Sequence, residues 1–174
     1  MARSNHIKKI SDTQGGFTGV LADGNPFSSS MTGLGDLDGD GVIDLMVGAQ
    51  GDVEGAVYVL FMNSDGTVKS HQKIGDETPI LSSWLDDDDS FSVSMTLMGD
   101  LDGDGVVDVA VGAHGDDDGG SARGAVYILF LNADGTLKAH QKIRTLRRPN
   151  LVESTRGICS GQRLPTWETW TATA

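Results

Sequence analysis

Aspartates recur at alternate positions in two short stretches of the chain, a spacing typical of a cation-binding loop. In the first stretch, carboxylates occupy loop positions 1, 3, 5 and 9, and Gly41 occupies position 6. A tight loop of this kind directs its odd-numbered side chains toward one point, and glycine at position 6 permits the sharp turn. The backbone carbonyl at position 7 can add another oxygen. The predicted metal ligands of this loop are Asp36, Asp38, Asp40, Val42 and Asp44.

The second stretch repeats every one of these positions. Its predicted ligands are Asp100, Asp102, Asp104, Val106 through its carbonyl, and Asp108. Four carboxylates so close together repel one another strongly unless a cation lies among them. Oxygen ligands suit a hard cation, and a flexible, many-oxygen arrangement favours calcium over magnesium. The sequence therefore predicts two calcium ions, one in each loop; a solvated acidic hairpin without an ion remains the alternative.

These loops differ from EF-hands. An EF-hand has a bidentate glutamate at position 12 and a helix on either side. Position 12 is Val47 in the first loop and Val111 in the second, and each loop runs directly into an apolar segment with the character of a strand.

The composition limits the classes of partner. The 174 residues include 13 basic and 25 acidic residues, for a net charge of −12. A surface so negative repels nucleic acid and anionic lipid and attracts cations, so we expect no nucleic-acid partner. No segment approaches the ~20 apolar residues of a membrane helix, so we expect no membrane insertion. Residues 1–10 lack the apolar core of a signal peptide.

Internal repeats define the organisation of the chain. Gly35–Ala49 recurs as Gly99–Ala113, 64 positions later, and Gly55–Asn63 recurs as Gly124–Asn132, 69 positions later. These offsets predict four segments. They are the last strand of a preceding repeat (1–10), a first repeat (11–74), a second repeat (75–143) and an atypical, poorly ordered tail (144–174).

Each repeat contains four predicted strands joined by turns. In the first repeat they are Phe27–Leu34, Ile43–Ala49, Ala56–Met62 and Val68–Ile74. The third is apolar throughout, which indicates a central strand covered on both faces. Asn63–Gly66 and Asn132–Gly135 have the composition of hairpin turns. Short strands in long repeats predict an all-β fold, a partial β-propeller of about two four-stranded antiparallel blades, with a leading strand and a disordered C-terminal tail.

Two further acidic stretches lie between predicted strands. The alternatives for Asp86–Asp89 and Asp116–Asp118 are a supplement to a cation site and a part of a ligand surface. We expect both to be solvated loops that keep the sheets in solution.

The aspartate loop followed by Val-Gly-Ala, with Phe27-Ser28 and Phe91-Ser92 upstream, resembles the FG-GAP repeat. That repeat builds the β-propeller of integrin α subunits and occurs in many bacterial secreted proteins. The resemblance implies that the eight aspartates of the two loops bind calcium and that the module is extracellular or on the cell surface. Two features depart from the family, since Phe-Ser replaces Phe-Gly and Val-Gly-Ala replaces Gly-Ala-Pro. The chain also holds about two blades where the integrin propeller has about seven.

The leading functional hypothesis is a non-enzymatic calcium-binding module for adhesion or surface binding, with an unknown protein or glycan as ligand. The sequence has no Gly-x-Ser-x-Gly motif and no phosphate-binding loop. The alternatives are an accessory propeller of a secreted hydrolase or lyase whose catalytic domain is absent, and a non-functional fragment. Two blades leave edges and apolar faces open, which predicts self-association.

Overall fold

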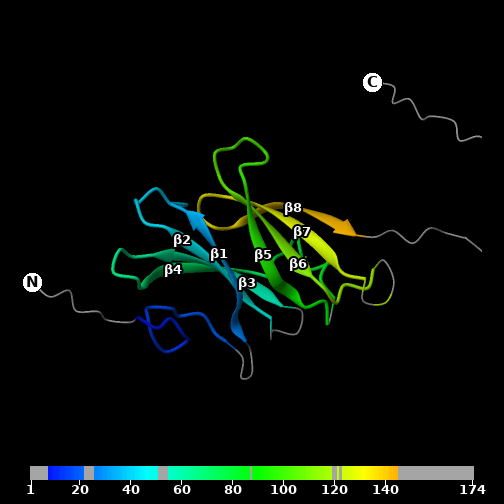
Figure 1. Ribbon diagram of the computed structural model, residues 1–174, viewed down its shortest axis with the longest axis horizontal. Helices are drawn as coiled ribbons and strands as arrows, with labels where there is room; N and C mark the ends of the chain where they lie inside the picture. Colours follow the sequence, from blue (N-terminus) through cyan, green and yellow to red (C-terminus); the bar gives the residue numbers. More distant parts are fainter. Residues whose placement is uncertain are drawn as a thin grey trace, which may run out of the picture.

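The chain folds into two four-stranded antiparallel sheets, as the sequence predicts (Figure 1). The computed structural model describes residues 8–21, 26–50, 55–86, 88–118, 121 and 123–144. Strands lie side by side in chain order, β1-β2-β3-β4 in the first sheet and β5-β6-β7-β8 in the second. This up-and-down order is that of two neighbouring blades of a partial β-propeller. The strands are β1 (Phe27–Gly35), β2 (Asp44–Ala49), β3 (Ala56–Met62), β4 (Val68–Ile74), β5 (Phe91–Gly99), β6 (Asp108–Ala113), β7 (Ala125–Leu131) and β8 (Leu137–Arg144).

Strand boundaries in the first sheet agree with the predicted ones to within a residue. Strand β1 extends to Gly35, and β2 begins at Asp44 rather than at Ile43. The buried Asp44 carboxylate accepts hydrogen bonds from the backbone N–H groups of Leu37 (3.0 Å) and Met62 (2.9 Å). These bonds fix Asp44 at the start of the strand, and Ile43 stays exposed at the end of the loop.

The third strand of the first sheet is its most buried element. All seven residues of β3 are buried, which confirms the prediction of a central strand covered on both faces. The hairpin that follows is closed by a hydrogen bond from Gly66 N–H to the Asn63 carbonyl (2.9 Å). Gly66 has a φ of 81°, a conformation that glycine adopts without steric cost.

The main hydrophobic core lies between the two sheets. Strand β1 runs beside β5, so the first sheet packs one face against the second (Figure 1). The connecting segment after β4 adds Leu81 and Leu85 to this core. The first sheet contributes Leu34, Met46, Val57, Val59, Phe61 and Ile74; the second contributes Phe91, Val109, Val111, Tyr127, Leu129 and Leu131.

A smaller cluster covers the other face of the first sheet. Phe17, from the segment that precedes β1, packs against Phe27 and Tyr58 with ring centroids 5.0 and 5.3 Å away. Val47 and Leu60 complete the centre of this cluster. The segment 8–21 thus lies on the first sheet in the place that the connection 75–85 takes on the second.

Two predictions concern the ends of the chain. Residues 8–10, the described end of the predicted leading strand, adopt no strand conformation. The rest of the predicted leading strand and all but the first residue of the predicted tail lie outside the described residues. Among the described residues, no helix is long and apolar enough to cross a bilayer.

Candidate metal centre

The first aspartate loop, between β1 and β2, is shaped by hydrogen bonds to its own carboxylates. Gly41 N–H donates to Asp36 Oδ2 (2.9 Å), and Val42 N–H donates to Asp40 Oδ1 (2.9 Å). Gly41 has a φ of 86°, so the sharp turn predicted at position 6 is present. Backbone donors therefore hold the acidic side chains in place before any ion binds.

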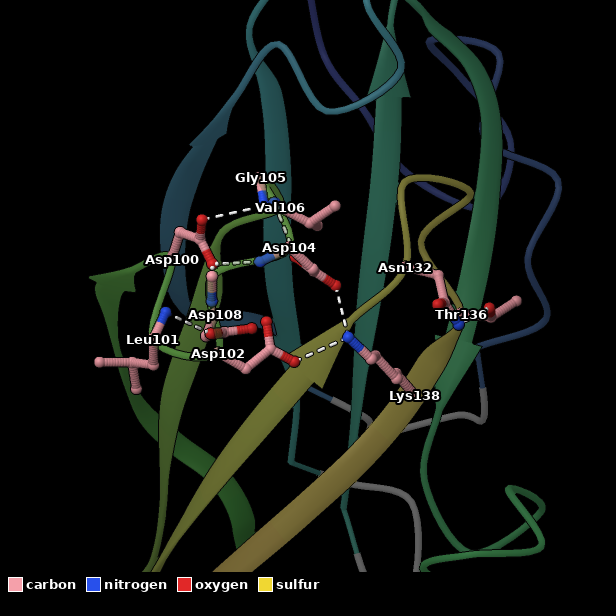
Figure 2. Close-up of polar contacts among 11 residues, drawn as sticks. Asp100, Leu101, Asp102, Asp104, Gly105, Val106, Asp108, Asn132, Thr136 and Lys138 are labelled. Atoms are coloured by element: carbon pink, nitrogen blue, oxygen red, sulfur yellow. Dashed lines mark hydrogen bonds and ion pairs between the residues drawn. The ribbon is translucent and has the colours of Figure 1, made fainter.

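The second loop, between β5 and β6, repeats this arrangement (Figure 2). Gly105 N–H donates to Asp100 Oδ2 (2.9 Å), and Val106 N–H donates to Asp104 Oδ1 (2.8 Å). Asp108, at the start of β6, accepts from Leu101 N–H (2.8 Å) as its counterpart Asp44 accepts from Leu37. The same local sequence thus produces the same loop twice.

Three carboxylates converge in each loop. One oxygen from each member of the first group lies within 4.8 Å of the others, and the same holds for the second group. The first group is Asp36, Asp38 and Asp40; the second is Asp100, Asp102 and Asp108. Oxygen atoms so spaced can hold a divalent cation.

The two groups differ in their third member. Asp44 of the first loop and Asp104 of the second lie outside these groups, although both were predicted as ligands. Asp44 already accepts two backbone hydrogen bonds, yet a carboxylate offers about four acceptor positions, so it retains capacity for an ion. The carbonyl oxygens of Val42 and Val106 stay predicted ligands.

A lysine from the last strand of each sheet reaches its aspartate loop. Lys69 Nζ, on β4, lies 2.6 Å from Asp38 Oδ2 and 2.6 Å from Asp40 Oδ2. Lys138 Nζ, on β8, lies 2.7 Å from Asp102 Oδ2 and 2.6 Å from Asp104 Oδ2, as Figure 2 shows. An ammonium group therefore neutralises part of the negative charge of each loop, at two of its carboxylates.

The ion pairs shift the protonation of both partners. The hydrogen bond from Lys69, with that from Val42 N–H, lowers the pKa of Asp40, and Lys138 with Val106 does the same for Asp104. The carboxylates in turn raise the pKa of each lysine. All four groups stay charged at neutral pH, and these carboxylates are available as anionic ligands once the ammonium moves away.

Neither lysine was predicted as part of the site. The signal was present, because Lys69 and Lys138 occupy the same repeat position, 69 residues apart, just after the hairpin turn. Their role depends on the packing of the fourth strand beside the loop, which the repeat pattern alone does not show.

The other two acidic stretches were predicted as solvated loops, and this is wrong for two of their residues. Asp89 and Asp116 are buried. Asp116 forms an ion pair with Lys142 of β8, whose side chain is 3% exposed. The burial follows from the folding of the loop against β8, which supplies a buried cation that the local sequence does not reveal.

The cluster around Lys142 contains more polar partners. Lys142 Nζ also contacts Asp118 Oδ2 (2.7 Å) and lies 5.1 Å from the centre of the Tyr127 ring. The Tyr127 hydroxyl donates to the Trp84 carbonyl (2.5 Å). Burial would lower the pKa of Lys142, but hydrogen bonds to Asp116, Asp118 and Tyr127 raise it. The cluster fastens the loop 114–118 to the second sheet.

Family comparison agrees with the repeated loop and sheet. Residues 36–111 match the FG-GAP-like repeat, and residues 96–129 match the FG-GAP repeat. Both aspartate loops lie within the matched span. The chain belongs to the FG-GAP repeat family.

Among curated proteins, the FG-GAP chain is similar to integrin α subunits. It is 36% identical over 123 residues to integrin alpha-3 of Cricetulus griseus, covering 67% of this chain and 11% of that protein. It is 38% identical over 118 residues to integrin alpha-7 of Rattus norvegicus, covering 61% of this chain and 9% of that protein. It is 33% identical over 128 residues to integrin alpha-PS2 of Drosophila melanogaster, covering 68% of this chain and 8% of that protein. The FG-GAP chain thus spans about a tenth of the length of these relatives.

Proposed function

We propose that this chain is a calcium-stabilised β-propeller module that works outside the cell, in adhesion or in binding to a surface ligand. One observation carries the calcium assignment, namely the convergence of three carboxylates in each of two loops of the same design. A single acidic turn is common on protein surfaces. Two independent loops with the same backbone hydrogen bonds favour a shared ligand.

The chemistry of the loops fits calcium. Every predicted ligand is an oxygen, and no histidine or cysteine takes part. Calcium accepts six to eight such ligands in flexible geometry, whereas magnesium demands a stricter octahedron. The ligands would be the aspartates of each loop with the carbonyls of Val42 and Val106. Calcium supplies the positive charge that offsets the repulsion among the carboxylates.

The expected role of the ion is structural. Each loop joins the first two strands of a sheet, and its last aspartate, Asp44 or Asp108, accepts a backbone hydrogen bond from the loop itself. Asp44 also accepts one from Met62 on β3. An ion bound by carboxylates in the same loop ties the turn to the strand that follows it. No group in the loops is placed as a nucleophile or a general base, so we propose no reaction.

Membership of the FG-GAP family and similarity to integrin α subunits support a role in adhesion or ligand binding. We place the module outside the cell, where calcium is millimolar. Extracellular calcium modules bind with dissociation constants of about 10⁻⁴–10⁻³ M. The ligand would be a protein or a glycan.

Thermal unfolding with and without calcium tests the proposal. At about 1 mM calcium, mass action with those constants stabilises the fold by about 0.5–1.5 kcal/mol per site. We expect the wild type to show two such increments, Asp38→Ala or Asp102→Ala to show one, and the double variant to show none. Magnesium at the same concentration should have a much smaller effect. An equal calcium response in the wild type and the double variant would contradict the assignment.

Lysine substitutions separate a calcium site from an acidic hairpin neutralised by its own lysine. Lys138→Met removes the ammonium that competes for Asp102 and Asp104. If the loop binds calcium, this variant should melt at a lower temperature in chelator and gain more from calcium than the wild type. If the ion pair alone balances the loop, the variant melts lower under both conditions and calcium restores nothing. Lys69→Met provides the matched test in the first sheet.

A further inference from the structure

The second sheet has an apolar face that the described residues cover only in part: Met98 and Ile143 are exposed there, whereas Ile128 is 9% exposed. Side chains alternate between the two faces along β7, so Val126, Ile128 and Phe130 point away from the core that contains Tyr127 and Leu129. Val126 is 40% exposed. A shallow groove lined by Ser94, Gly112, Val126 and Ile143 runs across this face.

The same positions in the first sheet are fully packed. Val57 corresponds to Val126 and is 0% exposed, because the second sheet lies against it. The same difference separates Leu34 from Met98 and Ile74 from Ile143, which are buried in the first sheet and exposed in the second. At the other two positions the difference is smaller, since Ile128 is buried like its counterpart Val59, and Phe130 is half-buried where Phe61 is buried.

The first sheet carries the complementary surface on its other side. A groove of about 510 Å³ is lined there by Phe27, by the exposed Met31 and by the buried Val47 and Leu60. Ile10 and Leu21, from the segment that covers part of this face, form another part of its wall. The corresponding residues of the second sheet pack directly against the first sheet. They are Phe91, Met95, Val111 and Leu129. The groove is therefore the place that the Val57 face of another sheet would fill.

A hydrogen bond across the existing interface joins two serines whose repeat counterparts lie on the two free faces. The Ser30 hydroxyl of the first sheet donates to the Ser92 carbonyl of the second (2.6 Å). Ser94 corresponds to Ser30, and Ser28 corresponds to Ser92. Ser28 and Ser92 have φ values of 72° and 77°, so both carbonyls sit in the same unusual backbone conformation. Ser94 and Ser28 thus form a matching donor and acceptor on the two free faces.

The glycine that lets the two sheets approach closely in the existing interface also has a counterpart on the free face. A methyl group on Gly55 would lie 2.3 Å from the Phe91 carbonyl oxygen, so only glycine lets the two sheets meet there. Gly124 corresponds to Gly55, and the nearest atoms to a methyl group on Gly124 belong to its own sheet, at Ala113 and beyond. Gly124 therefore leaves the same clearance for the Phe27 carbonyl of another copy of the chain.

We propose that copies of this chain associate head to tail, the Val126 face of one copy packing into the Met31 groove of the next. Each copy carries one half of an interface that its own two sheets already form. The contact is heterologous, so it joins unlike faces and leaves one face of each kind free at the ends of an assembly. The proposal does not depend on calcium, because both faces lie on strands rather than on the aspartate loops.

A mixing experiment with charged variants tests this arrangement. Val126→Lys blocks one face and Met31→Lys blocks the other; both residues are exposed, and lysine does not add to the negative net charge. Sedimentation velocity of the full chain should show the wild type growing with concentration into multiples of 18.3 kDa, and each variant alone at 18.3 kDa. An equimolar mixture of the two variants should give a species of twice that mass and nothing larger, because each variant retains the face that the other lacks.

Controls keep the test decisive. Val20→Lys changes a valine that is 86% exposed and lies outside both faces, and it should assemble like the wild type. Ile143→Lys blocks the Val126 face at a second position and should behave like Val126→Lys, with β-sheet circular dichroism confirming that every variant folds. A wild type that stays at 18.3 kDa at all concentrations would overturn the proposal. So would a mixture that remains monomeric, or a Met31→Lys variant that still dimerises alone.

Discussion

The two sheets have nearly the same sequence pattern but different surroundings. The repeat position held by Val57 in the first sheet and Val126 in the second is 0% exposed in one and 40% exposed in the other. At the position of Ile74 and Ile143, the same residue type is 1% exposed in the first sheet and 56% exposed in the second. The difference arises from what lies beside each sheet. A repeat thus encodes two faces for packing, and its stability depends on whether neighbours cover them.

The sheets also differ in how they hold their loops. In the second sheet, Lys142 is buried among Asp116 and Asp118 and fastens the loop before β7. In the first sheet the equivalent lysine, Lys73, has a side chain that is 24% exposed, and Glu77 is one of its partners. The lysine of the second sheet is therefore the more buried of the two, and this contrast can be measured.

The largest expected effect comes from removing that lysine. Lys142→Met leaves the buried Asp116 without its cation, and breaking a buried ion pair costs about 3–5 kcal/mol of unfolding free energy. Urea denaturation monitored by circular dichroism measures this loss. Lys138→Met is the matched control on the same strand, because its ion pairs are solvent-exposed and ordinary surface pairs contribute little. Similar losses in the two variants would show that Lys142 is not a special contact.

The next effect compares identical residues at equivalent positions. Ile74→Ala removes a side chain from the core between the sheets and should cost about 2–5 kcal/mol. Ile143→Ala acts on an exposed side chain and should change the stability of the dilute chain by no more than about 0.5 kcal/mol. Equal losses would mean that Ile143 is covered in solution even when the chain is dilute, and the contrast between the sheets would fail.

Acid should weaken both sheets, the second more than the first. The pKa values of Asp40, Asp104 and Asp118 are lowered from 3.8, chiefly by hydrogen bonds from Lys69, Lys138 and Lys142 respectively. A carboxylate with a lowered native pKa contributes stability above its unfolded pKa and loses it as the pH falls through the native value. In chelator, stability should therefore decline as the pH falls below about 3.8.

Asp118→Asn checks this pH dependence. It removes one of the carboxylates with a lowered pKa in the second sheet. The variant should therefore lose more stability at pH 7 than at pH 3, and its decline in acid should be flatter than that of the wild type. An acid profile identical to that of the wild type would contradict the assigned coupling between Asp118 and Lys142.

The smallest expected effect has the opposite sign. Burial raises the pKa of Asp89, so its charged form is disfavoured in the folded state. A raised native pKa contributes stability below the unfolded value, which is lost as the pH rises through the native value. Asp89→Asn keeps an acceptor for the Asp86 N–H and removes this loss. The variant should melt at a slightly higher temperature than the wild type at pH 7 and show no gain near pH 3.

Much of the fold was predictable because one repeat supports the other. The strands from Ala56 to Ile74 were placed correctly, since their apolar pattern and the Asn63–Gly66 turn are strong local signals. The boundary at Asp44 was missed by one residue, because it is set by hydrogen bonds to a strand that follows later in the chain. The burial of Asp116 could not be foreseen either, because its partner Lys142 belongs to the last strand.

The candidate site was predictable in composition and less so in geometry. The alternation of aspartate and glycine identified every residue that the structure brings together in the two groups. Side-chain orientation decides that Asp40 joins the group in the first loop and Asp108 the group in the second. Lys69 and Lys138 contact equivalent aspartates in the two loops, so they do not account for this difference.

Calorimetric titration of calcium into the metal-stripped chain tests the central claim most directly. The two equivalent loops predict two calcium ions per chain, with one lost in Asp38→Ala and the other in Asp102→Ala. Magnesium should displace neither at the same concentration. A stoichiometry of two that falls to one in each variant would support the account. The absence of binding at several millimolar calcium, in a chain whose circular dichroism shows folded sheets, would contradict it.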